Sequence, residues 1–395
     1  MKDKEIEQLI KNETKRQKSI INLIPSENYV SKDVLTALGS IFDNKYAEGY
    51  PHARYYGGQT YTDILEILCQ NRALKLFKLD KDSWHVNVQA LSGSPANLAV
   101  YLALVPPGGK VMGLPLASGG HLTHGHKVSI TGKVWQQIPI EIDLKTELID
   151  YRKMKADALR EKPALIIVGF TAYPRIVDFQ KCRDIADACG AYLMVDMSHF
   201  SGLVAGGAYP TPFNYADVVT TTTHKTLRGP RGAMIFSRKD KKVGDKSIST
   251  LIDKAIFPGL QGGPHMSQIA AIAVALKEAT DPTFKKYTRQ IVRNAKSLSG
   301  ELARLGWRII SGGTDSHLIL VDTWMNGKGI AGKDAEAKLE KAGIICNKNT
   351  IPGDTRSPFD PSGIRIGTPA ETTLGKKEKD MIKIARQIDK VLRSK

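Results

Sequence analysis

The middle of the chain alternates short apolar runs with segments of helical periodicity. The runs at 164–169 and 191–196 are apolar and rich in β-branched residues, which is typical of buried strands, and the segment 178–189 between them has helical spacing. A third run, at 217–223, ends in a turn of small residues. Strands that alternate with helices predict an α/β fold with a doubly wound sheet, parallel in most strands, that gathers ligands at the carboxyl ends of those strands.

Helical periodicity predicts further helices on both sides of this region. Apolar residues recur at helical spacing over 62–78 and over 287–305, and a turn of small residues at Ser92 opens a helix that runs to about Leu104. The segment 1–22 is amphipathic, so we expect it to pack on another subunit or on the main body.

The dipeptide Asp281-Pro282 interrupts a long helical stretch and marks a predicted domain boundary. Beyond it, the runs at 308–310 and 317–321 predict strands, and the polar, Pro-rich segment 347–359 predicts a loop. We therefore expect an N-terminal helical arm at 1–22, a large cofactor-binding domain at 23–280 and a smaller C-terminal α/β domain at 281–395.

Composition narrows the possible partners of the chain. No apolar run reaches the roughly 18 residues that a membrane span requires, and residues 1–8 mix acids with bases, so we expect a cytoplasmic protein without a membrane partner. The formal net charge of +17 favours anionic ligands. Nucleic acid would be attracted too, but Lys and Arg are spread along the chain among acids, and we do not expect nucleic acid as a partner.

Lys225 follows the strand predicted at 217–223 and stands beside His224, outside any amphipathic helix. Asp196 ends the preceding predicted strand, so both side chains should reach the same edge of the sheet. A lysine and an acid at two strand ends indicate pyridoxal phosphate chemistry, in which the lysine forms a Schiff base and the acid keeps the pyridine nitrogen protonated. Asp196 alone could equally cap a turn, and its pairing with His199 and Lys225 favours the catalytic interpretation.

Ser92, Gly93 and Ser94 form the turn that opens the helix ending near Leu104. A strand-to-helix turn of small residues leaves backbone N–H groups free at the positive end of the helix, which suits a phosphate. Because a Ser-x-Ser sequence also forms ordinary helix caps, the pattern by itself does not distinguish a phosphate site from a cap.

Three histidines, His121, His124 and His126, lie close enough in sequence to suggest zinc. No Cys, Asp or Glu nearby completes the ligand set. We therefore predict no metal site.

Two further segments allow both a structural and a functional interpretation. The loop at 45–59 is rich in Gly, Tyr and Pro, a composition that fits a subunit interface as well as a catalytic loop. Arg365 lies between two isoleucines in a short predicted strand, so its side chain should face away from theirs. It could bind a substrate carboxylate with its guanidinium fork, or it could be an exposed strand arginine.

Several segments resemble those of serine hydroxymethyltransferases. They occur across nearly the whole chain, at residues 44–51, 54–58, 119–125, 195–199, 220–227, 229–232, 258–264 and 362–369.

The resemblance implies the pyridoxal phosphate-dependent transferase fold of type I, with a mainly parallel seven-stranded sheet in the large domain and a smaller C-terminal α/β domain. It implies reversible transfer of a one-carbon unit from serine to tetrahydrofolate, which yields glycine and 5,10-methylenetetrahydrofolate. Two subunits build each active site in this family, so we expect a homodimer, with a tetramer left open.

The resemblance, together with the strand ends, also implies roles for individual residues. Glu48 would handle the proton of the substrate hydroxymethyl group, and His121 would stack on the pyridoxal ring. The expected catalytic residues are Lys225, Glu48, Asp196, His121 and Thr222. The expected cofactor-binding residues are Ser92, Gly93, Ser94, His121, Thr171, Asp196, His199, His224, Lys225, Tyr46, Gly262 and Gly263. The expected substrate-binding residues are Ser26, Glu48, Tyr55, Tyr56 and Arg365. The expected folate-binding residues are Leu116, Gly120, Leu122, Asn349, Ser357, Pro358 and Phe359.

The chain departs from the family pattern at Ser118, where members often have histidine, and its C-terminal end is shorter than usual. Two other functions fit part of the pattern. A threonine aldolase or aminotransferase could share the fold and the lysine, and a basic nucleic-acid-binding protein could keep the fold without the chemistry.

Overall fold

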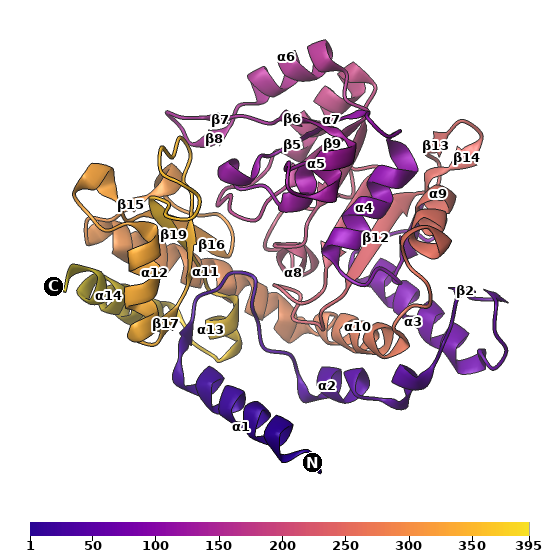
Figure 1. The fold of residues 1–395 in the computed structure, drawn as a ribbon, viewed down its shortest axis with the longest axis horizontal. Helices are drawn as coiled ribbons and strands as arrows, with labels where there is room; N and C mark the ends of the chain where they lie inside the picture. The colour runs from indigo at the N-terminus through magenta and orange to yellow at the C-terminus, as the bar shows by residue number, and fades with distance from the viewer. Residues whose placement is uncertain (395) are drawn as a thin grey trace.

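A seven-stranded sheet forms the centre of the larger part of the molecule (Figure 1). The structure is a computed structural model, and it describes residues 1–394. From one edge to the other, the strands are β4 (Trp84–Asn87), β12 (Ala233–Arg238), β11 (Val218–Thr222), β10 (Tyr192–Asp196), β9 (Leu165–Gly169), β5 (Lys110–Gly113) and β6 (Gln136–Pro139). Six of the seven strands run in one direction, and β12 runs antiparallel to its two neighbours, β4 and β11. The predicted mainly parallel sheet is confirmed.

Side chains of the central strands alternate between two hydrophobic clusters, as the two-residue period of a strand requires. Ile166 and Val168 pack into one cluster, and Leu165 and Ile167 pack into the other. Because both faces of the sheet are covered, β9 is buried along its whole length. The apolar, β-branched composition of this run, which predicted a strand, follows from that double burial.

Helices cover both faces of this sheet. The first cluster draws on α3 (Thr60–Leu76), α6 (Tyr151–Glu161), α7 (Phe179–Cys189), α8 (Ser201–Ala205) and α10 (Met266–Ala279). The second draws on α4 (Gly93–Leu104) and α9 (Ile248–Lys254). Three shorter pieces complete this part: α2 (Lys32–Leu38), which packs on α10, α5 (Ile130–Val134) and the irregular turn at 255–260. Three small antiparallel pairs lie at the surface: β2 (Gly49–Tyr50) with β3 (Ala53–Arg54), β7 (Ile142–Asp143) with β8 (Leu148–Ile149), and β13 (Lys242–Val243) with β14 (Lys246–Ser247).

The C-terminal part has its own antiparallel sheet and its own hydrophobic cluster. Its strands, in spatial order, are β15 (Arg308–Ile309), β16 (Leu318–Asp322), β19 (Gly363–Gly367) and β18 (Asn347–Asn349). The helices of this part are α11 (Pro282–Arg304), α12 (Gly332–Lys341), α13 (Pro369–Thr373) and α14 (Glu378–Arg393).

Two predicted boundaries in this part were wrong. The segment 347–349, predicted as loop, is the edge strand β18, whose polar side chains carry no apolar periodicity. The helix predicted from residue 287 begins at Pro282, because the Asp281 side chain accepts a hydrogen bond from the backbone N–H of Thr283 and proline suits the first helical turn.

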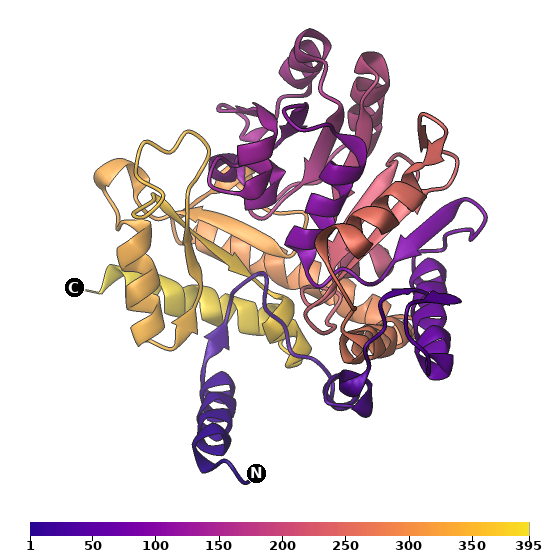
Figure 2. The same cartoon turned by 45° about the vertical axis from the view of Figure 1, so that its right-hand side comes forward.

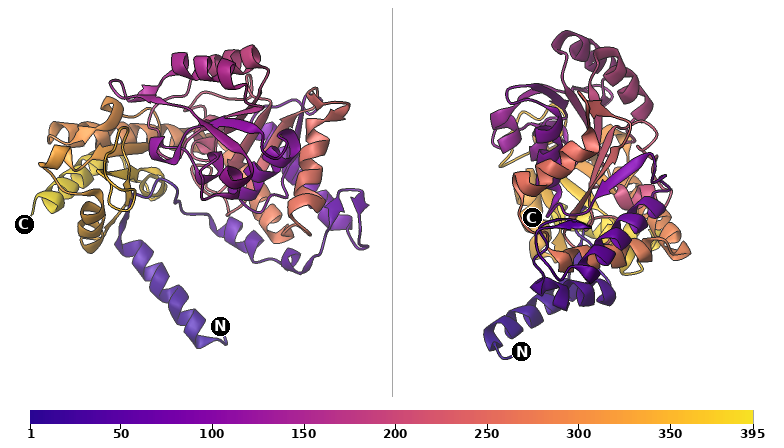
Figure 3. Two further views of the ribbon diagram at one scale, coloured as in Figure 1. Left: turned by 45° about the horizontal axis from the view of Figure 1, so that its top comes forward. Right: turned by 90° about the vertical axis from the view of Figure 1, so that its right-hand side faces the viewer.

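The N-terminal helix α1 (Lys4–Ser19) extends away from the rest of the chain and has no buried residue (Figures 2 and 3). After it, β1 (Ile21–Asn22) pairs in parallel with β17 (Ile344–Ile345), and Leu23 lies fully buried in the C-terminal cluster. The division at residues 22 and 280 stays a prediction, although Leu23 packs with the smaller part and not with the larger one. No helix within residues 1–394 is long and apolar enough to cross a membrane.

Candidate active site

A cavity of about 340 Å³ opens where β9, β10 and β11 end and α4 begins. Parallel strands gather their carboxyl ends there, so the cavity lies where the sequence predicts ligands. The predicted site residues that line it are Ser26, Ser92, Gly93, Ser94, His121, Thr171, Asp196, His199, Thr222, His224 and Lys225.

Asp196 is the last residue of β10 and is buried. One carboxylate oxygen accepts a hydrogen bond from Asn97 Nδ2 at 2.8 Å and lies 3.3 Å from His124 Nε2. Its other oxygen accepts from the backbone N–H of Ser198 at 3.0 Å. Burial alone raises the pKa of this carboxyl, but the hydrogen bonds from His124 and Asn97 outweigh it, so the pKa lies well below its ordinary value. A fixed buried anion of this kind fits the protonated ring nitrogen of pyridoxal phosphate, and the hydrogen bond from the Ser198 N–H shows that Asp196 also caps the turn after β10.

The orientation of the Asn97 amide is set from the neighbouring strand. Thr220 Oγ1 on β11 donates to Asn97 Oδ1 at 2.8 Å, which leaves the amide N–H groups for Asp196 and for Thr123 Oγ1. Neither Asn97 nor His124 was predicted as a site residue. His124 was considered only as a zinc ligand, and no group of three His, Cys, Asp or Glu within residues 1–394 could hold a metal ion.

Lys225 lies in the turn after β11 and is 9% exposed. Burial lowers the pKa of its amine to about 8, although the nearby Asp196 acts in the opposite direction. Within the part of the chain that the structure describes, the amine forms no salt bridge. An amine with a lowered pKa is partly neutral near physiological pH, which is the form that can attack an aldehyde.

The first turn of α4 forms the floor of the cavity. Ser92 caps the helix without a side-chain hydrogen bond, and a Cβ added at Gly93 would lie 2.8 Å from Thr222 Cγ2. Only glycine lets the helix start so close to β11. Its backbone N–H groups and positive dipole end then face the cavity, which suits a phosphate.

His121 stands at the side of the cavity in the turn before the short helix at 122–124. Burial, and then the neighbouring His124, lower the pKa of His121 to about 4, so its ring is neutral at physiological pH. Its Nδ1 lies 2.7 Å from Thr123 Oγ1, which fixes the ring. A fixed, neutral aromatic ring fits the stacking role that was predicted for it.

Arg365 on β19 does not line the cavity itself but lies against it. Its Nη1 donates to the backbone carbonyl of Thr171 at 2.6 Å, and its Nε donates to Asn347 Oδ1 at 3.0 Å. The flanking Ile364 and Ile366 pack into the C-terminal cluster on the other face, as predicted. With 8% exposure, Arg365 is not an exposed strand arginine. Burial lowers its pKa to about 10, and no carboxylate among residues 1–394 pairs with it, so the guanidinium remains suited to an external carboxylate.

Six predicted site residues gather elsewhere, around the β2–β3 hairpin. Tyr46 Oη lies 3.3 Å from Glu48 Oε1, and a Cβ added at Gly262 would come within 3.1 Å of that same oxygen. The members of this hairpin group are Tyr46, Glu48, Tyr55, Tyr56, Gly262 and Gly263. Its three tyrosines are 59%, 75% and 49% exposed. None of the group lines the cavity, and Figure 1 places β2 on the right of the molecule and β19 on the left.

The predicted folate residues lie on two segments, 116–122 and 349–359, which come from the two parts of the molecule. The loop at 116–118 meets the loop after β18 through a hydrogen bond from Thr350 Oγ1 to the carbonyl of Ala117, at 3.3 Å. None of the predicted folate residues lines the cavity: Leu116, Gly120, Leu122, Asn349, Ser357, Pro358 and Phe359.

Five residues that line the cavity were not predicted as site residues. They are Glu27, Asn97, Phe170, Ser198 and Arg231. Arg231 stands in a Gly-Pro-Arg-Gly turn shortly after Lys225, and that proximity was the available signal.

A buried lysine and a buried acid at adjacent strand ends, beside an open helix N-terminus, define a pyridoxal phosphate-dependent enzyme of fold type I. The family model described as serine hydroxymethyltransferase matches residues 1–388. The chain belongs to the serine hydroxymethyltransferase family.

Individual relatives agree with this assignment. The chain is 51% identical to the cytosolic serine hydroxymethyltransferase of Aspergillus fumigatus, over 99% of this chain and 85% of the relative. It is 49% identical to a probable cytosolic serine hydroxymethyltransferase of Schizosaccharomyces pombe, with the same coverage. It is 52% identical to a serine hydroxymethyltransferase of Acidobacterium capsulatum, over 98% of this chain and 87% of the relative.

Proposed function

We propose that this chain catalyses the reversible conversion of serine and tetrahydrofolate to glycine and 5,10-methylenetetrahydrofolate. Membership of the family supports the reaction. The observation that carries the chemistry is the cavity at the ends of two parallel strands. Lys225 and Asp196 both line it, and their opposite charges interact.

Pyridoxal phosphate, when bound, supplies an electron sink for the bond that breaks at the substrate Cα. We propose that the Lys225 amine attaches the cofactor and that Asp196 holds a proton on its ring nitrogen. The first turn of α4, from Ser92 to Ser94, holds the phosphate. His121 would stack on the ring, and Thr171, His199, Thr222 and His224, which also line the cavity, would make the other cofactor-side contacts.

Arg365 and Ser26 hold the substrate carboxylate in this proposal. The Thr171 carbonyl and Asn347 already fix the guanidinium. It can therefore orient the carboxylate with little further loss of side-chain conformational entropy. Fixing the carboxylate sets which bond at Cα stands perpendicular to the ring, and thereby which bond reacts.

We propose that the hairpin group acts in the cavity of a second copy of the chain. Glu48, carried by that copy, holds or moves the proton of the substrate hydroxyl, Tyr55 and Tyr56 contact the substrate, and Tyr46, Gly262 and Gly263 contact the cofactor. The supporting observation is that these residues lie outside their own cavity and that the three tyrosines are exposed. A homodimer with shared sites explains why these residues lie outside the cavity of their own chain.

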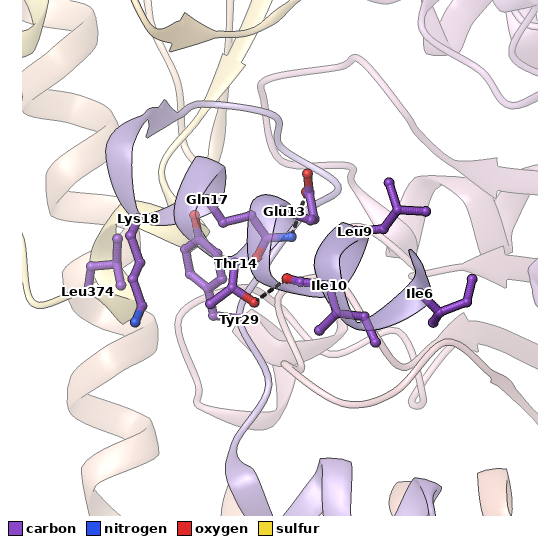
Figure 4. A pocket seen from close by; sticks show the side chains of 9 residues that line it. All are labelled: Ile6, Leu9, Ile10, Glu13, Thr14, Gln17, Lys18, Tyr29 and Leu374. Carbon is purple, nitrogen blue, oxygen red and sulfur yellow. Dashed lines mark hydrogen bonds between the residues drawn. The ribbon is translucent and has the colours of Figure 1, made fainter. Parts of the chain in front are cut away.

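Helix α1 supplies a surface for such a second copy. Its apolar residues Ile6, Leu9 and Ile10 are 45%, 62% and 53% exposed. Together with Tyr29 and Leu374 they line a hollow of about 810 Å³ between the helix and the body (Figure 4). Exposed apolar area of this kind favours association. In a two-fold symmetric dimer, this surface of each copy would be covered by the other copy.

Tetrahydrofolate is proposed to bind at the rim, between the loop at 116–122 and the loop at 349–359. Ser118, which departs from the family pattern, lies in the first of these loops. We place the reaction in the cytosol, because the fungal relatives carry that word in their names.

The decisive experiment measures glycine formation from serine with and without tetrahydrofolate. We expect turnover of serine to depend on tetrahydrofolate and to vanish in Lys225→Ala together with the visible absorption of the bound cofactor. An unchanged rate without tetrahydrofolate would favour a folate-independent aldolase. Salt-dependent RNA binding without any cofactor absorption would favour the nucleic-acid-binding alternative.

A further inference from the structure

Two buried imidazoles pair behind the cavity and join the two sheets. His199 Nδ1, in the turn after β10, lies 3.1 Å from Nε2 of His317, the residue before β16. The rings stack at 26°. His199 lines the cavity and His317 does not. No step proposed above uses His317.

Both rings are neutral at physiological pH. Burial is the main cause that lowers the pKa of each, well below the ordinary value for His199 and to about 3 for His317. The cations Lys225 and Arg365 act in the same direction on both rings. A neutral imidazole carries one N–H donor and one acceptor nitrogen, so the hydrogen bond between the rings contains one shared proton.

Two arrangements satisfy that hydrogen bond. If His199 Nδ1–H donates, the remaining N–H of the pair is on His317 Nδ1, a buried atom for which residues 1–394 provide no partner. If His317 Nε2–H donates, the remaining N–H is on His199 Nε2, which is equally without a partner in the chain but belongs to a ring that lines the cavity. A buried donor without an acceptor is destabilising, so the arrangement whose spare donor faces a ligand is favoured.

We propose that His317 is a positioning residue that donates from Nε2 to His199 and so presents the His199 Nε2–H as a neutral donor to an anionic oxygen of the bound cofactor. This inference rests on the proposed function only for the identity of the acceptor. The tautomer itself is a property of the chain alone.

The first test reads the tautomer directly. Long-range ¹H–¹⁵N spectra of the full-length, histidine-labelled protein, with and without pyridoxal phosphate, should show His199 protonated on Nε2 in both forms. The signals are assigned by comparison with His199→Gln and His317→Gln. Protonation of His199 on Nδ1 in the wild type overturns the proposal, whatever the enzyme is found to catalyse.

The second test shows whether His317 acts as a hydrogen-bond donor or only through packing. His317→Phe keeps a ring but has no donor, whereas His317→Gln keeps an amide N–H near the position of Nε2. We expect the affinity for pyridoxal phosphate to fall about tenfold in the Phe variant, equivalent to about 1.4 kcal/mol, and to recover to near the wild-type value in the Gln variant. In the Phe variant, His199 should also lose its single tautomer.

Equal losses in the two variants, or no loss in either, would reduce His317 to a packing residue and overturn the proposal. Thermal unfolding of each variant monitors the fold, and His85→Phe, a histidine outside the cavity lining, is the matched control. If wild-type protein binds no pyridoxal phosphate, the proposed function fails while the tautomer measurement still decides the role of His317.

Discussion

The Lys225 amine is buried, and burial disfavours its positively charged form. Its pKa is about 8 in the folded protein, against an ordinary value of 10.5. Below pH 8 both the folded and the unfolded chain bind this proton, and the folded state carries the full cost of burying it. Between pH 8 and 10.5 the unfolded chain binds more protons than the folded one, so stability rises with pH across that window.

We therefore expect cofactor-free Lys225→Met to be more stable than cofactor-free wild type at pH 7, with about 3 kcal/mol of the difference due to the charge. That advantage should shrink as the pH rises from 8 toward 10. Urea unfolding of both proteins at several pH values measures it. Lys379→Met, at an exposed position of α14, is the control. A difference that stays constant with pH would contradict a lowered pKa at Lys225.

Sequence reasoning reached Lys225 and Asp196 because each stands at the end of a run whose composition already predicts a buried strand. It did not reach Asn97 and His124, which contact Asp196 from α4 and from the turn at 122–124. Neither residue has a local signal, since an amide on a helix or a histidine in a turn is common. Their role arises only when the sheet brings distant segments to one carboxylate.

Among the elements that form the cavity, α4 depends on a small residue in its first turn. Gly93 allows the first turn to approach β11, where Thr222 Cγ2 would lie 2.8 Å from an added Cβ. A methyl group there must displace either the Thr222 side chain or the start of the helix. In the second case the backbone N–H groups would move with the helix.

We expect Gly93→Ala to weaken pyridoxal phosphate binding by about tenfold or more, equivalent to roughly 1.4 kcal/mol. Fluorescence or absorbance titration of the cofactor measures it. Gly300→Ala is the matched control, because Gly300 lies inside α11 with nothing within 4 Å of an added Cβ. That control should leave the affinity unchanged and raise stability by about 0.5–1 kcal/mol. Unchanged affinity in Gly93→Ala would mean that the phosphate binds elsewhere.

Elements with strong periodicity were predicted well, and α3, α4 and β9 agree with the structure to within about two residues. The edge strand β18 was missed because it pairs on one side only and carries Asn and Lys side chains. One of those side chains, Asn347, holds Arg365 in place. The polar side chains that conceal β18 from pattern analysis therefore include one that the site needs.

At the scale of the whole molecule, the division of the site between two copies is the main expectation. Glu48→Gln and Lys225→Ala should each be inactive as homodimers. In a mixed dimer one of the two cavities would contain an intact Lys225 and receive an intact Glu48. Co-expression of the two variants with different tags should therefore restore about a quarter of the wild-type activity when the copies pair at random.

Activity of the doubly purified mixed dimer, assayed in serine and tetrahydrofolate, checks this and should reach about half of the wild-type value, because one of its two sites is intact. The control is a mixture of Lys225→Ala with Asp196→Ala, two changes on the same cavity, for which no intact site can form. Activity in the control, or none in the first pair, would contradict shared sites. Sequence patterns alone could not decide which copy provides Glu48, because they contain no information on the distance between the hairpin group and the cavity.

The parallel pairing of β1 with β17 joins two stretches from opposite ends of the chain. During synthesis the amino-terminal stretch leaves the ribosome early, yet its partner strand does not exist until Ile345 has been added. We expect the larger sheet to form first, while Ile21 and Leu23 are still exposed to solvent. Any chain terminated before Ile344 would leave β1 without its partner strand and Leu23 with only part of its hydrophobic cluster, so apolar surface that the complete cluster buries would stay exposed.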